Sequence, residues 1–284
     1  MGRPKIVIVT DSSAYIPDAA LEGLNVSVIP LWLLWDNERL QDGVDIDPPA
    51  FYRRLRASKT LPSSSQPSPK EFEEFFREVA KEADAIVSVL ASSKLSGTVA
   101  SAEAAQAELT DLPVRVVDSL SSSMGQGFIV LAAARAAAAG KTLDEVVAAA
   151  EAMRERMHFL FVVDTLEYLH RGGRIGGAKR LLGTALSIKP LLQFRDGQIE
   201  PLSQARTKPR AITRLLEVIE ERLGGKAMAA ACVVDIDAPD DGYAVAELLR
   251  ARFAPPTLYR STVSPVVGTH VGPGALGVAF YTEA

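Results

Sequence analysis

The sequence predicts an α/β protein, in which an N-terminal three-layer α/β/α domain with a mainly parallel sheet precedes a C-terminal mixed α+β domain. Two observations carry this prediction. Up to residue 157, short apolar runs alternate with capped helical segments, the order that gives a parallel sheet with helices on both faces. Beyond residue 158, two strand-like runs flank Asp196-Gly197, a strong hairpin signal that implies antiparallel pairing. We therefore expect domains at residues 1–157 and 158–284.

The elements of the first half follow from apolar runs and helix caps. Apolar runs closed by polar residues are typical of buried parallel strands, and they predict strands at 5–11, 26–35, 85–90 and 114–118. The sequences 68–71 and 142–145 are capping boxes, Asp47-Pro48 is a cap with proline at the first helical position, and Gly140 is a helix stop. The predicted helices are 51–57, 69–83, 98–109, 125–139 and 146–157.

The second half has a different pattern. Strands are expected at 191–195, 198–202, 229–235 and 257–259, and helices at about 209–223 and 242–253. Cys232 stands in an apolar run, where a buried strand residue is the better interpretation than a nucleophile. The segment 264–277, rich in glycine, is expected to form a loop before the last strand.

Composition narrows the class of protein. The chain has 284 residues, of which 48% are hydrophobic and 23% charged, as in a soluble globular protein with a sizeable core. A formal net charge of −4 argues against a nucleic-acid binder with a broad basic face. One cysteine and three histidines make a transition-metal centre unexpected. Residues 1–5 lack the apolar stretch of a signal peptide and 128–139 is too short to span a bilayer, so a cytoplasmic location is expected.

Four polar loops lie where strands end or helices begin, at 10–13, 62–69, 91–98 and 118–125. Each alone is best interpreted as a solvated turn or cap. Ligands of open α/β sheets bind at the carboxyl ends of the strands, however, so loops that share one edge can converge on one site. Amides at a helix N-terminus there would also suit an anion.

The loop 264–277 adds a histidine to this set. Its glycines let the backbone approach a small ligand closely, and His270 can offer a proton or a lone pair. The simpler alternative is a connector in which His270 bonds to the backbone. Arg171 and Arg174, beside paired glycines, would either attract a carboxylate or phosphate or stay solvated at a helix C-cap. The basic patch around Arg206 would suit an acidic partner, although a solvated face is the simpler interpretation.

Motifs that the chain lacks also limit its function. It has no complete P-loop, no G-x-G-x-x-G after a strand, no G-x-S-x-G and no H-E-x-x-H. Two further functions stay open on the residues alone. One is an acyl or phosphoryl hydrolase with a loop serine as nucleophile and His270 as base. The other is a regulator that binds a small anion at helix N-termini.

Taken together, these segments resemble the DegV family of bacterial fatty-acid-binding proteins, which includes the FakB-type binding subunits of fatty acid kinase. The matching residues run in order from 10 to 277 and so cover nearly the whole chain. They are Thr10-Asp11-Ser12, Ser65-Gln66-Pro67-Ser68-Pro69, Ser92-Ser93-Lys94-Leu95-Ser96-Gly97-Thr98, Asp118-Ser119, Tyr168-Leu169, Gly172-Gly173-Arg174-Ile175, Lys189-Pro190, Arg206-Thr207 and 264–277.

The resemblance implies a carrier that holds one long-chain fatty acid, of the palmitate or stearate class, in a buried apolar tunnel between the two domains. It would present the carboxylate to a separate ATP-dependent fatty acid kinase for acyl-phosphate formation, as part of phospholipid metabolism. By this resemblance the chain has no catalytic residues of its own and needs no cofactor or metal. The function allows a transient contact with a membrane for lipid exchange.

The resemblance also implies the residues of the site. The carboxylate would be bound by Ser64, Ser92, Ser93 and His270. Thr10, Asp11, Ser12, Arg174, Gly268 and Thr269 would lie near the head group or in its loops, and Arg206 would belong to the face that meets the kinase. Ser64 is a departure, because the family commonly has threonine there. The hydroxyl is kept and a methyl group is lost.

Overall fold

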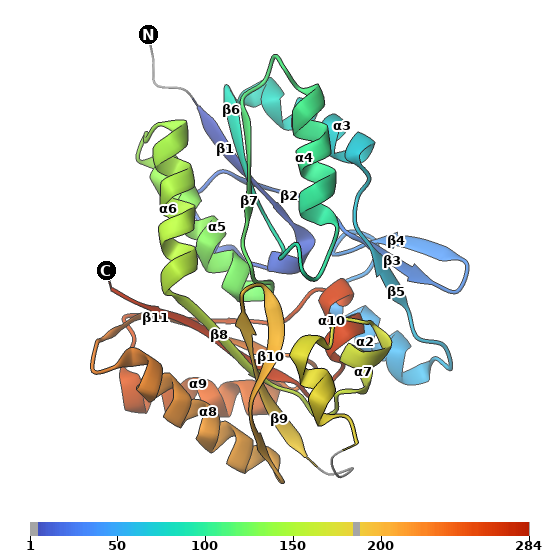
Figure 1. Ribbon diagram of the computed structural model, residues 1–284, viewed down its shortest axis with the longest axis vertical. Coiled ribbons are helices and arrows are strands. Elements are labelled where there is room, and N and C mark those ends of the chain that lie inside the picture. The colour runs from blue at the N-terminus through green and yellow to red at the C-terminus, as the bar shows by residue number, and fades with distance from the viewer. Residues whose placement is uncertain (1–4, 184–187, 284) are drawn as a thin grey trace.

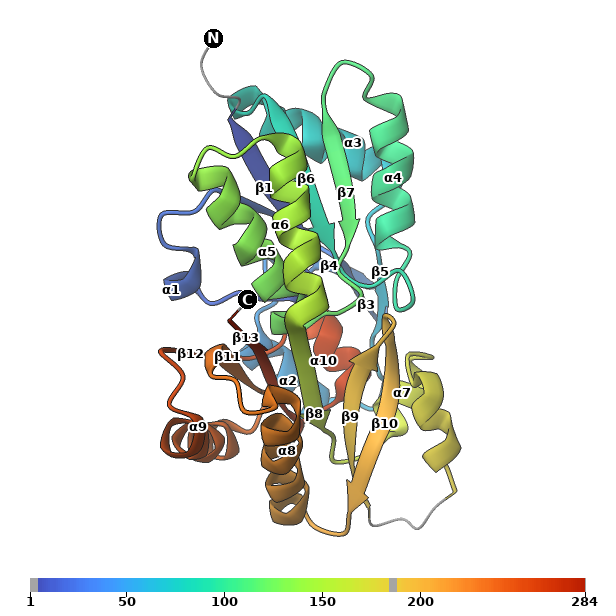
Figure 2. The same cartoon turned by 60° about the vertical axis from the view of Figure 1, so that its left-hand side comes forward.

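The N-terminal half is built around a parallel sheet with helices on both faces (Figures 1 and 2). The computed structural model describes residues 5–183 and 188–283. The sheet has the strand order β2-β1-β6-β7, with all neighbours parallel. Its strands are β1 (Ile6–Asp11), β2 (Val26–Ile29), β6 (Ala85–Leu90) and β7 (Val114–Asp118). One face is covered by α3 (Pro69–Val79) and α4 (Thr98–Glu108), the other by α5 (Ser123–Ala138) and α6 (Leu143–Arg156).

A small antiparallel sheet of strand order β4-β3-β5 lies beside the parallel sheet (Figure 1). It is formed by β3 (Trp32–Trp35), β4 (Glu38–Gln41) and β5 (Ser63–Ser65). The single strand expected at 26–35 was therefore wrong, because the chain leaves the parallel sheet at Pro30, which has no N–H to continue the ladder. Part of the loop expected at 62–69 is the strand β5. Short helices fill the connections: η1 (Ser12–Ala14), α1 (Asp18–Leu21), α2 (Pro48–Ala57) and η2 (Ala80–Glu82).

The C-terminal half contains a six-stranded mixed sheet of order β10-β9-β8-β13-β11-β12. Its strands are β8 (Met157–Val162), β9 (Lys189–Arg195), β10 (Gln198–Ala205), β11 (Met228–Asp235), β12 (Thr257–Ser261) and β13 (Leu276–Thr282). The hairpin predicted at Asp196-Gly197 joins β9 and β10, with Arg195 opposite Gln198. Helices α8 (Lys208–Leu223) and α9 (Pro239–Phe253) cover one face of the sheet, and the other face turns toward the N-terminal half (Figure 1).

Three short helices lie between the two halves or at their edge: α7 (Glu167–Arg171), η3 (Gly176–Leu181) and α10 (Pro265–Val271). The helix α10 corrects the expectation of a loop over 264–277. Ser264 caps it by accepting a hydrogen bond from the Val267 N–H, and Pro265 occupies the first helical turn. This serine–proline start is a helix signal that the glycines of the segment obscured. His270 therefore lies in the last turn of a helix, and Gly272, with φ of 76°, follows its end.

One apolar core joins the two halves. Ile8 and Phe128 of the first half belong to the same buried cluster as Leu192 and Val234 of the second. Cys232 is also buried in this cluster, and burial raises the pKa of its thiol. The expected fold class, a three-layer parallel-sheet domain followed by a mixed α+β domain, is confirmed. The division at 157/158 stays a prediction; β8 begins at Met157.

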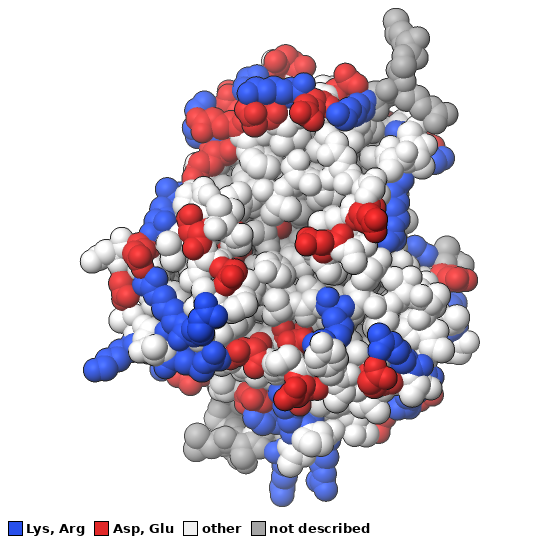
Figure 3. Space-filling model, turned by 180° about the vertical axis from the view of Figure 1, so that it is seen from behind, with Lys and Arg blue, Asp and Glu red and all other residues white. Residues whose placement is uncertain are grey.

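The surface carries both signs of charge. On the face seen in Figure 3, Lys and Arg alternate with Asp and Glu around the rim and at both ends, while the middle is largely uncharged. No helix in the described part of the chain is long and apolar enough to cross a membrane. Within residues 5–183 and 188–283, no cluster of three or more His, Cys, Asp or Glu could hold a metal ion. Residues 1–4 of the N-terminal segment considered above lie outside the described residues.

Candidate ligand-binding site

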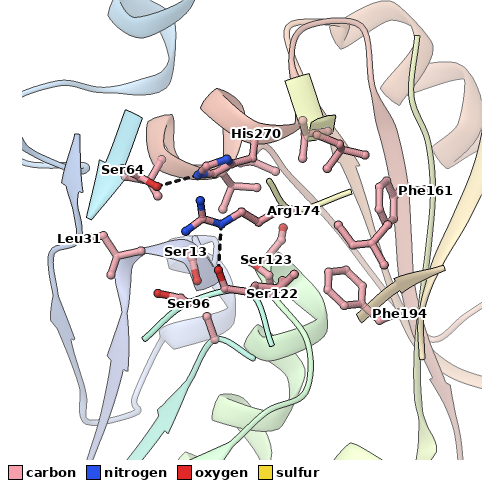
Figure 4. A pocket seen from close by; sticks show the side chains of 18 of the residues that line it. Ser13, Leu31, Ser64, Ser96, Ser122, Ser123, Phe161, Arg174, Phe194 and His270 are labelled. Carbon is pink, nitrogen blue, oxygen red and sulfur yellow. Dashed lines mark hydrogen bonds between the residues drawn. The ribbon is translucent and has the colours of Figure 1, made fainter. Parts of the chain in front are cut away.

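A mostly apolar cavity lies between the carboxyl edge of the parallel sheet and the inner face of the C-terminal sheet (Figure 4). About 890 Å³ of space that no atom fills lies within it, part of which is open to solvent. The second half of the chain supplies most of its apolar wall, including Phe159, Phe161, Phe194, Ile199, Val234 and Val267. We call this space the apolar cavity.

Polar groups gather at one side of the apolar cavity. The Oγ of Ser64, on β5, lies 2.6 Å from Nε2 of His270, on α10, so segments far apart in sequence form a hydroxyl–imidazole pair. Figure 4 shows this pair across the cavity from Phe161 and Phe194. Two glycines permit the placement of α10. A Cβ on Gly172 would lie 2.2 Å from His270 Nδ1, and one on Gly268 would lie 2.4 Å from the Tyr52 hydroxyl.

The imidazole of His270 is neutral near pH 7. Burial, with a smaller contribution from the Arg174 charge, lowers the pKa of His270 to about 4. Its Nδ1 is buried and has no hydrogen-bond partner among the described residues. A neutral imidazole carries one proton, so the pair has two arrangements. When Nε2 donates to Ser64, the serine proton is free for an acceptor in the cavity.

Arg174 provides positive charge at the same place. Its Nε donates to the Leu95 carbonyl at 3.0 Å, and its Nη1 donates to the Gly172 carbonyl at 2.7 Å. These bonds hold the guanidinium between the loop after β6 and the end of α7. Its Nη2 makes no hydrogen bond to the described residues, and the side chain lines the apolar cavity. Arg174, and Ser64 when His270 donates to it, can thus offer donors to one carboxylate.

Besides Ser64 and Ser65 on β5, four serines of the first half line the cavity: Ser13, Ser96, Ser122 and Ser123 (Figure 4). Ser123 is the most unusual of them. It begins α5 at φ of 50°, it is 1% exposed, and its Oγ has no partner among the residues described. A buried hydroxyl without a partner is costly and indicates a ligand or water in that place. The sequence pointed to the loop 118–125 but gave no reason to single out this serine.

The triplet Thr10, Asp11 and Ser12 lies behind the cavity wall. Asp11 accepts hydrogen bonds from the Ala91 N–H at 2.8 Å and from both the N–H and the hydroxyl of Ser13. The pKa of this carboxyl is raised because burial opposes its charge. Ser12 Oγ donates to Asp42 at 2.6 Å. These residues fix the first strand end and position Ser13, which does line the cavity.

Two expected carboxylate ligands are not brought to the cavity. Ser92 is buried, but its hydroxyl donates to the Gly197 carbonyl at 2.7 Å and thereby ties the loop to the β9–β10 hairpin. Ser93 is exposed, and neither serine lines the cavity. The loop makes a helical turn, with the Ser96 N–H donating to the Ser92 carbonyl, which places Leu95 and Ser96 at the cavity instead.

The remaining expected residues lie on α10 beside His270 or at the surface. Gly268 packs on Tyr52 rather than facing the cavity. Thr269 donates its hydroxyl to the Pro265 carbonyl at 3.0 Å and lines a second cavity on the outer side of His270. Arg206, at the end of β10, is exposed.

Two further cavities adjoin the apolar one. The first, which we call the basic cavity, shares Ser64, Arg174 and His270 with it and is otherwise lined by Lys59, Leu61, Pro62, Ser63, Tyr168, Arg171, Gly172 and Thr269. The second, which we call the polar cavity, shares Phe159 and Phe194 with it and is otherwise lined by Ser119, Leu120, Arg154, Glu155, Met157, His158, Leu160, Gln193, Asp196 and Arg222. The apolar cavity thus has a polar side at Ser64 and His270, where the resemblance leads us to expect the head group (the head-group side), and an aromatic side at Phe194.

Known proteins resemble the chain over its whole length. The family model described as an uncharacterised protein of the DegV family matches residues 5–283. A DegV domain-containing protein of Streptomyces coelicolor is 43% identical over 275 residues, covering 96% of this chain and 97% of the relative.

Solved structures agree with this match. A DegV family protein from Thermus thermophilus, described by its fatty acid binding, is 34% identical to this chain. The two structures superpose with a TM-score of 0.92, and the match covers 98% of this chain and 100% of the other. DegV of Bacillus subtilis, described as a fatty acid binding protein, is 33% identical with a TM-score of 0.90, covering 99% and 100%. The chain belongs to the DegV family.

Proposed function

We propose that this member of the DegV family binds one long-chain fatty acid in the apolar cavity, with the carboxylate at Ser64 and His270 and the tail toward Phe194. The observation that carries the proposal is the cavity itself, an apolar space with a neutral hydroxyl–imidazole pair and one arginine at a single side. The fatty acid binding by which the Thermus thermophilus and Bacillus subtilis proteins are described supports it.

The apolar cavity and its polar side provide for the two ends of such a ligand. Burial of methylenes contributes about 0.8 kcal/mol each, so a chain of about sixteen carbons gains roughly 12 kcal/mol before the costs of association and ordering. The carboxylate must keep its hydrogen bonds when it leaves water. Ser64, whose proton is freed when His270 donates to it, and Arg174 supply donors for this purpose, and Ser96 and Ser123 add hydroxyls on the adjoining wall.

The finer part of the proposal is that the chain presents the carboxylate to a separate ATP-dependent fatty acid kinase. The head-group side supports this, because Ser64, His270 and Arg174 also line the basic cavity on their outer side. A reagent that reached the basic cavity would meet the carboxylate end rather than the tail. Arg206 would belong to the docking face, and its exposure suits that role.

The hydroxyl–imidazole pair favours binding over hydrolysis. In a hydrolase of the serine–histidine type, a third group orients the imidazole through its second nitrogen. Here Nδ1 of His270 has no hydrogen-bond partner within the described part of the chain. A regulator that binds only a small anion would have no use for the apolar cavity.

Native mass spectrometry of the freshly purified protein, followed by organic extraction, tests the proposal. We expect one fatty acid per chain, and the extract would also report its length and unsaturation. A protein that is empty, and that also fails to bind added palmitate after delipidation, would refute fatty-acid binding. Turnover of ATP by the purified chain with a fatty acid, in the absence of a kinase, would refute the carrier role.

A further inference from the structure

The start of α5 is a buried helix end whose polar groups lack partners. Ser122 is the N-cap residue, but its side chain makes no capping hydrogen bond. The N–H groups of Ser123, Met124 and Gly125 have no acceptor among the described residues. All four residues are buried. The first N–H groups of a helix need partners, and at a buried end water does not supply them freely, so a ligand group is expected there.

Three other helices of the N-terminal half begin differently. The side chain of Asp47 caps α2, and capping boxes at Ser68 and Thr142 begin α3 and α6. These three cap residues are exposed, so water could also have served the helix ends that they begin. The helix α5 thus combines a buried start with the lack of a cap.

The unpartnered groups of α5 face the apolar cavity. Ser122 and Ser123 both line it, and in the view of Figure 4 they lie between Arg174 and Phe194. Ser123, with its buried and unpaired hydroxyl, is also held at φ of 50°. Strained backbone and unpaired buried polar groups are concentrated at ligand sites. We call the hydroxyls of Ser122 and Ser123, together with the three free N–H groups of α5, the polar notch.

The polar notch offers more donors than a carboxylate can use. A carboxylate has about four acceptor sites. Ser64, when His270 donates to it, and the two N–H bonds of Arg174 Nη2 can fill three of these sites. The two hydroxyls and three N–H groups of the polar notch exceed what remains. A second oxygen on the ligand would use the surplus.

We propose that the polar notch binds a hydroxyl group on the acyl chain, so that the preferred ligand is a long-chain fatty acid hydroxylated near its carboxyl end. Such a hydroxyl can accept a hydrogen bond from an N–H group of α5 and donate one to Ser122 or Ser123. An unsubstituted acid leaves the surplus donors unpaired, which costs affinity. The inference rests on the proposed function, because it requires an acyl chain in the apolar cavity.

Four acids of the same chain length test the polar notch: palmitate and its 2-hydroxy, 3-hydroxy and 16-hydroxy derivatives. Each displaces a fluorescent fatty acid from the delipidated protein, and the readout is the affinity for a hydroxy acid divided by the affinity for palmitate. The variants are Ser122→Ala, Ser123→Ala, the double variant, and Ser123→Gly, since glycine adopts φ of 50° without strain. The matched control is Ser101→Ala, because Ser101 on α4 is 8% exposed, as Ser122 is, but lines none of the cavities described above.

In the wild type, the 2-hydroxy or the 3-hydroxy acid should bind about tenfold more tightly than palmitate, because it supplies the partners that the polar notch lacks. This ratio should fall about threefold in each single variant and about tenfold in the double variant. The 16-hydroxy acid carries its hydroxyl to the aromatic side, so its ratio should be no higher than one and the same in all variants. The Ser101→Ala variant should leave every ratio unchanged. A loss that is common to all four acids cancels, because each ratio is taken within one variant.

Ratios of one or below for both the 2-hydroxy and the 3-hydroxy acid in the wild type would overturn the inference. A raised ratio that the Ser122 and Ser123 variants leave unchanged would overturn it too, because the hydroxyl would then be bound elsewhere. In both cases, tight binding of palmitate would leave the proposed function intact. Failure of the wild type to bind any of the four acids would instead refute the proposed function, and the inference with it.

Discussion

Phe194 is predicted to limit the length of the acyl chain. Its ring stacks on Phe159 at a centroid distance of 5.6 Å with an interplanar angle of 8°, and contacts Phe161 at 5.9 Å. Phe159 and Phe194 line both the apolar and the polar cavity, so this stacked pair forms the wall between them. A terminal methyl group that passed the wall would enter a space lined by Arg154, Glu155 and Asp196, where it would gain little binding free energy from apolar burial.

The substitution Phe194→Ala removes six ring carbons from this wall. If about three methylenes of a longer chain take their place, at about 0.8 kcal/mol each, a C20 acid gains about 2 kcal/mol relative to palmitate. This corresponds to a rise of roughly 30-fold in the ratio of the two affinities. Palmitate itself should bind somewhat more weakly, since its tail loses contact with the ring.

The assay is displacement of a fluorescent fatty acid from delipidated protein by saturated acids of increasing length. Phe75→Ala is the matched control, because Phe75 is also partly buried but packs in the core cluster between α3 and the parallel sheet. The control should lower stability without changing the preferred length. A folded Phe194→Ala protein whose C20-to-palmitate ratio equals that of the wild type would show that the aromatic wall does not set the length.

Three other predictions concern the polar groups. His270→Ala should weaken palmitate binding about tenfold at unchanged fold, because Ser64 loses the imidazole that directs its hydroxyl proton to the carboxylate; equal affinity in the displacement assay would remove His270 from the head-group site. Ser123→Ala should leave the free energy of unfolding of the ligand-free protein unchanged or raised, because its buried hydroxyl has no partner, and should weaken palmitate binding; unchanged binding would show that the ligand does not reach this serine. Burial raises the pKa of Asp42 to about 6, whereas the same group in the unfolded chain titrates near 4. Between these pH values the folded protein holds a proton that the unfolded chain has released, so this group adds to the free energy of unfolding as the pH falls through 6. Asp42→Asn removes that gain, so urea unfolding should find the variant less stable relative to the wild type at pH 4 than at pH 7, by about 2 kcal/mol; the opposite titration of His270 is common to both proteins and cancels.

The sequence predicted the regular parts of the fold well, because local signals decide them. The capping boxes at Ser68 and Thr142 begin α3 and α6 as expected, with both reciprocal bonds of each box present. The hairpin at Asp196-Gly197 likewise follows from two adjacent residues. Such signals depend only on residues close together in sequence, so they can be recognised without knowledge of tertiary contacts.

The site was harder to predict, because tertiary contacts decide which residue of a loop faces the ligand. In the loop 91–98, Ser92, Ser93 and Ser96 are chemically alike, and only the helical turn of the backbone selects Ser96 for the cavity. Ser123 differs from its neighbours through a positive φ and an unpaired hydroxyl, neither of which composition reveals. The pairing of Ser64 with His270 joins residues 206 positions apart.

The small antiparallel sheet is the part of the fold that the sequence did not predict. It is also the part that builds the head-group side of the site. Ser64 is placed by β5, where it pairs with Leu33 of β3. Asp42, just after β4, accepts a hydrogen bond from Ser12 at the first strand end and another from the Val266 N–H at the start of α10. One buried carboxylate thus connects the parallel sheet, the small sheet and the helix that carries His270. A shift of the small sheet would therefore move both members of the Ser64–His270 pair, whereas Phe159 and Phe194 of the C-terminal sheet lie outside this network.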